Sequence, residues 1–191
     1  MGRPTLATVL SWLGQHGPWL SLALVPLWFV FHSVAKPSAA WQAQYLATDT
    51  AQVFLVQREQ ELSHLWDDKG ILPAPQFAER QFSAQFSTCV TLAQAQEVAL
   101  MLVARGQAEL QINQKPILTL DETNERLTRG TKLSLAKGTH HLRVNYASDG
   151  KFPSVALLAS FDGAPPKPLA SGTLVNGVKT LLPNTEGTAC E

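Results

Sequence analysis

The sequence predicts a mainly β protein, an antiparallel β-sandwich with one N-terminal transmembrane helix. Two observations predict the sandwich. The first is that, from residue 80 onward, short runs of alternating apolar and polar residues follow one another at intervals of about 8 to 14 residues. The second is that Gly, Pro or Asn, which favour turns, stand between these runs. A third observation, an uncharged apolar run near the start of the chain, predicts the helix.

The apolar run extends from Pro18 to Ala35 and contains no charged side chain. A helix rises about 1.5 Å per residue, so this run would span about 27 Å, close to the thickness of a hydrocarbon core. Trp19 stands at its first edge, as is common for aromatic residues at the membrane interface. We therefore expect a leader at 1–17, a transmembrane helix at 18–35 in contact with the lipid bilayer, and a linker at 36–40.

Two alternatives for this run stay open: the core of a cleaved signal peptide, with Ser33-Val34-Ala35 as the cleavage site, and a buried helix of a soluble domain. The flanking charges, Arg3 and Lys36, are balanced and do not set an orientation. Both cysteines lie beyond the run, which suits an oxidising compartment. We therefore expect a cell-membrane protein with a cytoplasmic N-terminus and a periplasmic or extracellular main domain.

Length and composition limit the possible functions. The chain has 191 residues, with 15 Lys and Arg against 15 Asp and Glu, so the formal net charge is zero. Such a chain lacks the basic excess typical of nucleic-acid binding, and we expect no nucleic-acid partner. The sequence holds no CxxC motif or Cys/His cluster, so we expect no structural metal and no other cofactor.

The first part of the main domain gives mixed signals. Trp41, Ala43 and Tyr45 alternate with polar residues, which predicts a strand with one buried face. In residues 51–66 a strand-like VFLV precedes the helix-favouring QREQELSHLW, so the sequence leaves this segment undecided. DDKG then indicates a turn, and Pro73 ends the segment.

The rest of the domain is predicted to be β. The run 97–106 is apolar at nearly every position, so we expect a central strand covered on both faces. Residues 107–120 predict a hairpin that turns at 113–115, and 121–130 a polar loop. Residues 163–191 predict a tail that adds a last strand or docks on the sandwich. The further expected strands are 80–92, 131–138, 138–148 and 153–163.

A series of short motifs runs from Trp41 to Phe161. They are Trp41 with Tyr45; Arg58, Leu62 and Trp66; Pro73; Phe82 with Phe86; Leu110 and Ile112 to Lys115; Gly138, His140, Leu142, Val144 and Tyr146; and Ser154 to Phe161. Their order resembles that of the protective-antigen domain family (PA-fourteen), a β-sandwich found in bacterial toxins, glycosidases and fungal adhesins. The resemblance implies a sandwich at 41–162 and a binding module whose ligand is a glycan or an envelope polymer.

One position departs from the family. Sugar-binding members place an Asp-Asp pair just before the hairpin, where it coordinates calcium. The corresponding residues here read Ala104-Arg105-Gly106. We therefore do not expect a calcium-dependent lectin site at this position.

Two oxygen-rich segments supply the candidate ligand-binding residues. Asp67 and Asp68 lie in the DDKG turn, and Asp121 and Asn124 lie in the polar loop; the alternative for each is a solvated turn. No Gly-x-Ser-x-Gly, Ser-x-x-Lys or phosphate-binding glycine motif is present. We therefore expect no enzyme and name no catalytic residue.

Two further residue pairs carry structural predictions. A disulfide between Cys89 and Cys190 would close a loop of about 100 residues and stabilise the fold by about 4–5 kcal/mol. Two free thiols, or a bond from Cys190 to another chain, are the alternatives. His140 and His141 face opposite sides of a strand, and alternation with Leu142 turns His140 toward the core and His141 outward.

Two functions follow from these predictions. The first is a non-catalytic, membrane-anchored extracytoplasmic binding module. The alternative is an accessory or structural subunit of a multi-subunit membrane complex, in which the sandwich and residues 18–35 contact partner membrane proteins.

Overall fold

The computed structural model describes residues 40–47, 53–66, 77, 82–121, 125–148, 152–170, 172–174, 178–183 and 187–190. The chain divides into two units, 1–37 and 38–191, and all described residues belong to the second. The expected transmembrane helix at 18–35 and its two alternatives lie outside the described residues. Within the described ranges, no helix has both the length and the apolar character needed to cross a bilayer.

The larger sheet is built around the long strand β4 (Phe82–Leu92). One edge of β4 pairs with β9 (Gly138–Ala147) along its whole length. The other edge is shared, because its first half pairs with β1 (Trp41–Ala47) and its second half with β13 (Val178–Leu181). The sheet is completed by β2 (Val53–Glu59), β6 (Gln107–Ile112), β7 (Lys115–Leu120) and β12 (Gly172–Leu174).

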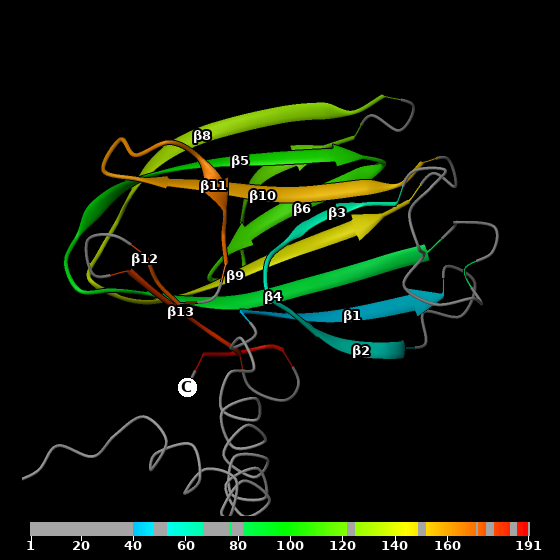
Figure 1. Ribbon diagram of the computed structural model, residues 1–191, viewed down its shortest axis with the longest axis horizontal. Helices are drawn as coiled ribbons and strands as arrows, with labels where there is room; N and C mark the ends of the chain where they lie inside the picture. Colours follow the sequence, from blue (N-terminus) through cyan, green and yellow to red (C-terminus); the bar gives the residue numbers. More distant parts are fainter. Residues whose placement is uncertain are drawn as a thin grey trace, which may run out of the picture. The chain divides into compact units, whose positions relative to one another are not determined.

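The smaller sheet has the order β11-β10-β5-β8, and β3 also pairs with β10 (Figure 1). All its pairs are antiparallel, as in the larger sheet. Its strands are β3 (Ser63–Leu65), β5 (Gln96–Arg105), β8 (Leu127–Leu135), β10 (Ser154–Phe161) and β11 (Lys167–Pro168).

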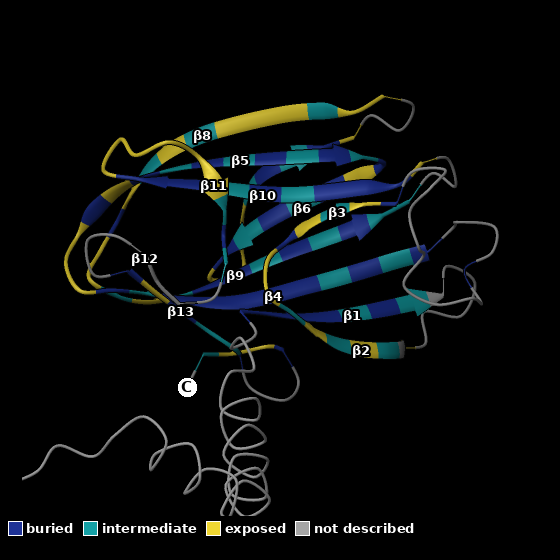
Figure 2. Ribbon diagram, viewed as in Figure 1, coloured by how far each residue is buried: buried dark blue, intermediate teal, exposed yellow. Residues whose placement is uncertain are grey.

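The hydrophobic core lies between the two sheets. Burial alternates along β5, along the first half of β4 and in the middle of β10, so these parts turn one face inward and one outward (Figure 2). This pattern confirms the predicted antiparallel β-sandwich and the buried face of 41–45. The largest fully buried side chains include Trp41, Tyr45, Phe82, Phe86, Leu100, Leu102, Leu110 and Leu157.

Three segments differ from the sequence predictions. The undecided stretch after residue 51 forms strands β2 and β3. The polar loop at 121–130 is shorter than expected, because β8 already begins at Leu127. The prediction that 97–106 is covered on both faces is wrong for the described residues: β5 is central, but its outer face is half-exposed. An antiparallel sandwich has only two layers, so a central strand needs to bury only one face.

The C-terminal region is part of the fold. Residues 163–191 contribute β11, β12 and β13, and Cys190 forms a disulfide with Cys89 of β4, with an S–S distance of 2.06 Å. The predicted pairing is therefore confirmed. Arg143 Nη2 donates a hydrogen bond of 3.4 Å to the carbonyl oxygen of Gly187, so the end of the chain lies over the outer face of the larger sheet.

This C-terminal segment contacts one of the two adjacent histidines, His141. His141 faces outward, as predicted, but it is only 7% exposed and forms a hydrogen bond with the backbone of Gly187. Burial, and then the positive charge of Arg143, lower the pKa of His141. His140 is less buried, and its Nε2 lies 2.8 Å from the carbonyl oxygen of Ala136.

Candidate functional site: a polar groove on the larger sheet

A row of polar side chains crosses the outer face of the larger sheet. Strand pairing sets its members opposite one another, one from each of five neighbouring strands, because alternate residues of a strand share a face. We call this set the polar row. It consists of Gln44 on β1, Gln85 on β4, Asn145 on β9, Glu109 on β6 and Thr119 on β7.

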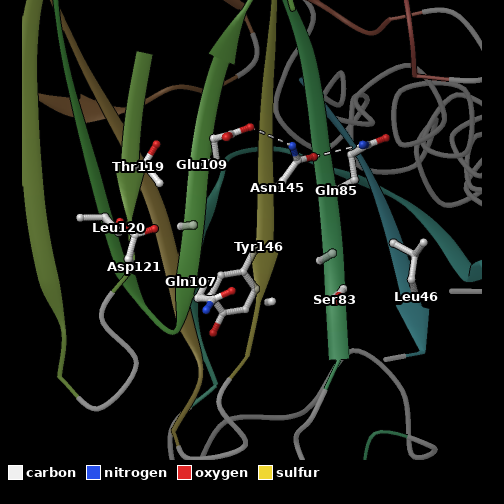
Figure 3. A pocket seen from close by; sticks show the side chains of 13 residues that line it. Leu46, Ser83, Gln85, Gln107, Glu109, Thr119, Leu120, Asp121, Asn145 and Tyr146 are labelled. Carbon is white, nitrogen blue, oxygen red and sulfur yellow. Dashed lines mark hydrogen bonds between the residues drawn. The ribbon is translucent and has the colours of Figure 1, made fainter. Parts of the chain in front are cut away.

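Hydrogen bonds fix the centre of the polar row. Gln85 Nε2 donates to Asn145 Oδ1 at 3.1 Å, and Asn145 Nδ2 donates to Glu109 Oε1 at 3.5 Å (Figure 3). Gln111 Nε2 donates to the same carboxylate oxygen. Glu109 Oε1 thus accepts both amide groups, and within the described residues Oε2 of Glu109 and Oε1 of Gln85 remain as acceptors for a ligand.

Four members of the polar row, all except Gln44, line a groove of about 440 Å³. The hollow arises in the next row of the sheet, where the small residues Ser83 and Ala147 lie opposite each other between the longer Leu46 and Gln107. Asp121, which directly follows β7, lies at the same groove. A volume of this size is within the usual range of small-molecule sites, about 300–1,000 Å³.

The chemistry of the lining favours a neutral, hydroxyl-rich ligand. Glu109 and Asp121 supply carboxylate acceptors, and the amides of Gln85, Gln107 and Asn145 supply both donors and acceptors. Among the described residues, no Lys or Arg lines the groove, so an anionic ligand would meet two carboxylates without a compensating cation from these residues. A sugar offers hydroxyl groups that both donate and accept, which matches this mixture of groups.

The structure places one of the four predicted site residues at the groove. Asp121 lies at the groove, whereas Asp67, Asp68 and Asn124 lie outside the described residues. The sequence does not single out Gln85, Gln107, Glu109 and Asn145, because each is an ordinary polar residue of an expected strand until the strand register is known. In the part of the chain that the structure describes, no three His, Cys, Asp or Glu side chains gather as a metal site would require.

No protein-family model matches the chain, and no curated protein matches its sequence. Solved structures do match the fold. An anti-sigma factor domain-containing protein aligns with a TM-score of 0.60 at 17% identity, covering 71% of this chain and 46% of that one, so this chain spans less than half of that protein.

Two solved structures of sugar-binding proteins share the fold over nearly the whole length of their own chains. The PA14 sugar-binding domain from an RTX adhesin aligns with a TM-score of 0.57 at 11% identity, covering 69% of this chain and 94% of that one. The epithelial adhesin 9 A domain from Candida glabrata, solved in complex with Galb1-3GlcNAc, aligns with a TM-score of 0.56 at 6% identity, covering 78% and 96%. At these identities the likeness concerns the fold alone, and it confirms that the described domain is a PA14-like β-sandwich.

Proposed function

We propose that this protein is a non-catalytic glycan-binding module and that the groove beside the polar row is its binding site. The observation that carries the proposal is the hydrogen-bonded series Gln85–Asn145–Glu109, which holds amide and carboxylate groups in fixed positions at the edge of a groove of about 440 Å³. Groups held in place before binding lose little side-chain entropy when a sugar binds.

Two further findings support a binding role. The solved structures that share the fold include a sugar-binding domain and an adhesin domain with a bound disaccharide. The sequence also lacks the motifs for nucleophilic catalysis considered above. Fold likeness alone does not identify a ligand, so the groove carries the assignment.

The proposal includes the location of the module. The apolar run Pro18–Ala35 would anchor the chain in a membrane, with the sandwich on the extracytoplasmic side. The disulfide between Cys89 and Cys190 supports this location, because such bonds persist in oxidising compartments. The ligand would then be a glycan or an envelope polymer at the cell surface.

A second function, as an accessory subunit of a membrane complex, is favoured by a different observation. The outer face of the smaller sheet carries half-exposed apolar residues, including Met101 and Leu158, which suit protein contact. In that case the full-length chain would copurify in mild detergent with other proteins in fixed stoichiometry. It would also leave a glycan array unlabelled.

The test is a glycan array probed with the full-length chain, with calcium and with a chelator. We expect binding to a neutral saccharide in both conditions, because the described residues that line the groove contain no cluster of metal ligands. Asn145→Ala should weaken binding at least tenfold, since Asn145 is the central member of the hydrogen-bonded series. The matched control is Thr139→Ala, an exposed residue of the same strand that does not line the groove. No labelling of any glycan, or equal binding by Asn145→Ala and the wild type, would contradict the proposal.

A further inference from the structure

The outer face of the smaller sheet differs in character from the outer face of the larger one. On β5 the outward-facing residues are Glu97, Ala99, Met101, Val103 and Arg105, and we call them the β5 stripe. Its three middle residues are apolar and half-exposed, and its two ends carry opposite charges. The corresponding face of the larger sheet bears the polar row instead.

Strand β10 extends the apolar centre of the β5 stripe on one side, whereas β8 places Thr128 and Lys132 opposite Val103 and Ala99 on the other. Ala156 and Leu158 of β10 lie opposite Val103 and Met101, and both are half-exposed. On the other side, Gly130 of β8 lies opposite Met101, and a Cβ at Gly130 would come within 3.4 Å of Met101 Cγ. The small residues keep this face flat, which suits packing against another sheet about 10 Å away.

The two charged ends of the β5 stripe make only loose contacts within the described part of their own copy. The guanidinium carbon of Arg105 lies 5.3 Å from the ring centre of Phe152. Glu97 forms an ion pair of 3.8 Å with Lys132, but the two side chains are 65% and 74% exposed. Such an exposed pair contributes little and can rearrange.

We infer that this face is the interface with a second copy of the chain. Met101 lies midway between Glu97 and Arg105 on one strand. A two-fold axis that lies in the interface, perpendicular to β5 and over Met101, brings the two Met101 residues together. The same rotation sets Ala99 against Val103 and Glu97 against Arg105. The stripe is therefore complementary to itself in both shape and charge.

The size of the face indicates a reversible dimer. Strands β5, β8 and β10 are about 30 Å long and about 4.8 Å apart, and the short strands β3 and β11 share a fourth row. Together they cover roughly 500 Å² per copy, or about 1,000 Å² in total, the range of weak, transient interfaces. In this arrangement the two larger sheets lie on the outside. Their grooves would face away from each other, so one dimer would hold two ligands and bind a polymer with increased avidity.

The first test places a cysteine on the axis. The native cysteines are bonded to each other, so Met101→Cys in the full-length chain carries one free thiol. Under mild oxidation we expect a disulfide-linked dimer on a non-reducing gel. Lys115→Cys, an exposed position at the β6–β7 turn, is the matched control and should stay monomeric. Equal crosslinking of the two variants, or none, would overturn the inference.

The second test exchanges the charges. In analytical ultracentrifugation of the full-length chain in detergent at up to about 100 μM, the wild type should sediment as a concentration-dependent dimer, as expected for an interface of this size. Arg105→Glu and Glu97→Arg should each weaken dimerisation at least tenfold, and the double variant should restore it. Lys115→Glu should have no effect. Thermal unfolding of each variant separates lost dimerisation from lost folding. Recovery of dimerisation in the double variant would show that the single changes act through the pairing of the two charges between copies.

Several outcomes would overturn the inference. The wild type could remain monomeric throughout, or the double variant could fail to recover. Alternatively, the chain could bind phosphatidylcholine vesicles or a different protein through this face, with Met101→Lys abolishing that binding while no dimer forms. Each of these results would assign the face to an occupant other than a second copy.

Discussion

The hydroxyl group of Tyr146 joins the two sheets: it donates a hydrogen bond of 2.6 Å to the carbonyl oxygen of Arg105. The same hydroxyl accepts a bond of 3.1 Å from the backbone N–H of Ser154. Tyr146 belongs to β9 of the larger sheet, whereas Arg105 and Ser154 belong to neighbouring strands of the smaller one. One side chain therefore satisfies a donor and an acceptor at the end of the sandwich.

Tyr146→Phe should lower the free energy of unfolding by about 1–3 kcal/mol, because one buried and one partly buried backbone group lose this hydrogen-bond partner. Urea denaturation followed by circular dichroism measures this change. Tyr45→Phe is the matched control. Its hydroxyl is 3.5 Å from Glu59 Oε1, so its removal breaks only one long bond and should matter less. An equal loss in both variants would show that the bridge between the sheets has no special role.

The disulfide should make a large contribution to stability. Cys89 and Cys190 are separated by 101 residues, and in the chain-entropy model a crosslink over such a loop stabilises the fold by about 4–5 kcal/mol. Cys89→Ser/Cys190→Ser should lower the free energy of unfolding by about this amount in urea. Reduction of the wild type with dithiothreitol is the parallel measurement and should give the same value. A double variant as stable as the oxidised wild type would contradict the prediction.

Stability should fall in mild acid because of His64. Its ring stacks on Trp66 with centroids 4.8 Å apart, and also on Phe86, and burial lowers the pKa of His64 to about 4. The unfolded chain binds a proton near pH 6.5, so stability is complete above that pH. It is lost progressively between pH 6.5 and about 4, by about 3 kcal/mol in all.

His64→Phe keeps an aromatic ring in the stack and should remove most of this pH dependence. Unfolding free energies at pH 7.5 and pH 4.5 give the comparison. The pKa of His141 is also lowered, so part of the pH dependence should remain in His64→Phe. The double variant His64→Phe/His141→Gln measures how much of that remainder comes from His141. If His64→Phe loses as much stability in acid as the wild type, His64 is not the responsible group.

The sequence predicted the sandwich well where alternation was strong. Phe82, Ala84 and Phe86 all lie in the core, and the hairpin turns where expected. Asn113 and Gln114 have φ values of 49° and 68°, as in the two-residue turn that suits the twist of a hairpin. Local residue patterns determine such features, so one sequence is enough to find them.

The groove could not be predicted in the same way. Gln85, Glu109 and Asn145 are far apart in the chain, and they meet only because β4, β9 and β6 pair in one particular register. A shift of one residue in any strand would turn its polar side chain to the opposite face. Asp121 was found because it belongs to a polar loop, although nothing in the sequence linked that loop to the polar row.

Gly106 should affect both stability and binding. Its φ is 106°, and a Cβ there would come within 2.5 Å of the carbonyl oxygen of Ala147, a residue that lines the groove. Gly106→Ala therefore combines backbone strain of about 1–3 kcal/mol with a clash that pushes β6 away from β9.

Gly138→Ala is the matched control, because its φ is 131° but a Cβ there meets no atom within 4 Å. In urea unfolding and on the glycan array, Gly106→Ala should lose more stability than Gly138→Ala, and it alone should weaken ligand binding. Equal effects of the two variants would mean that strain, and not the close approach of β6 to β9, sets the requirement for glycine at 106.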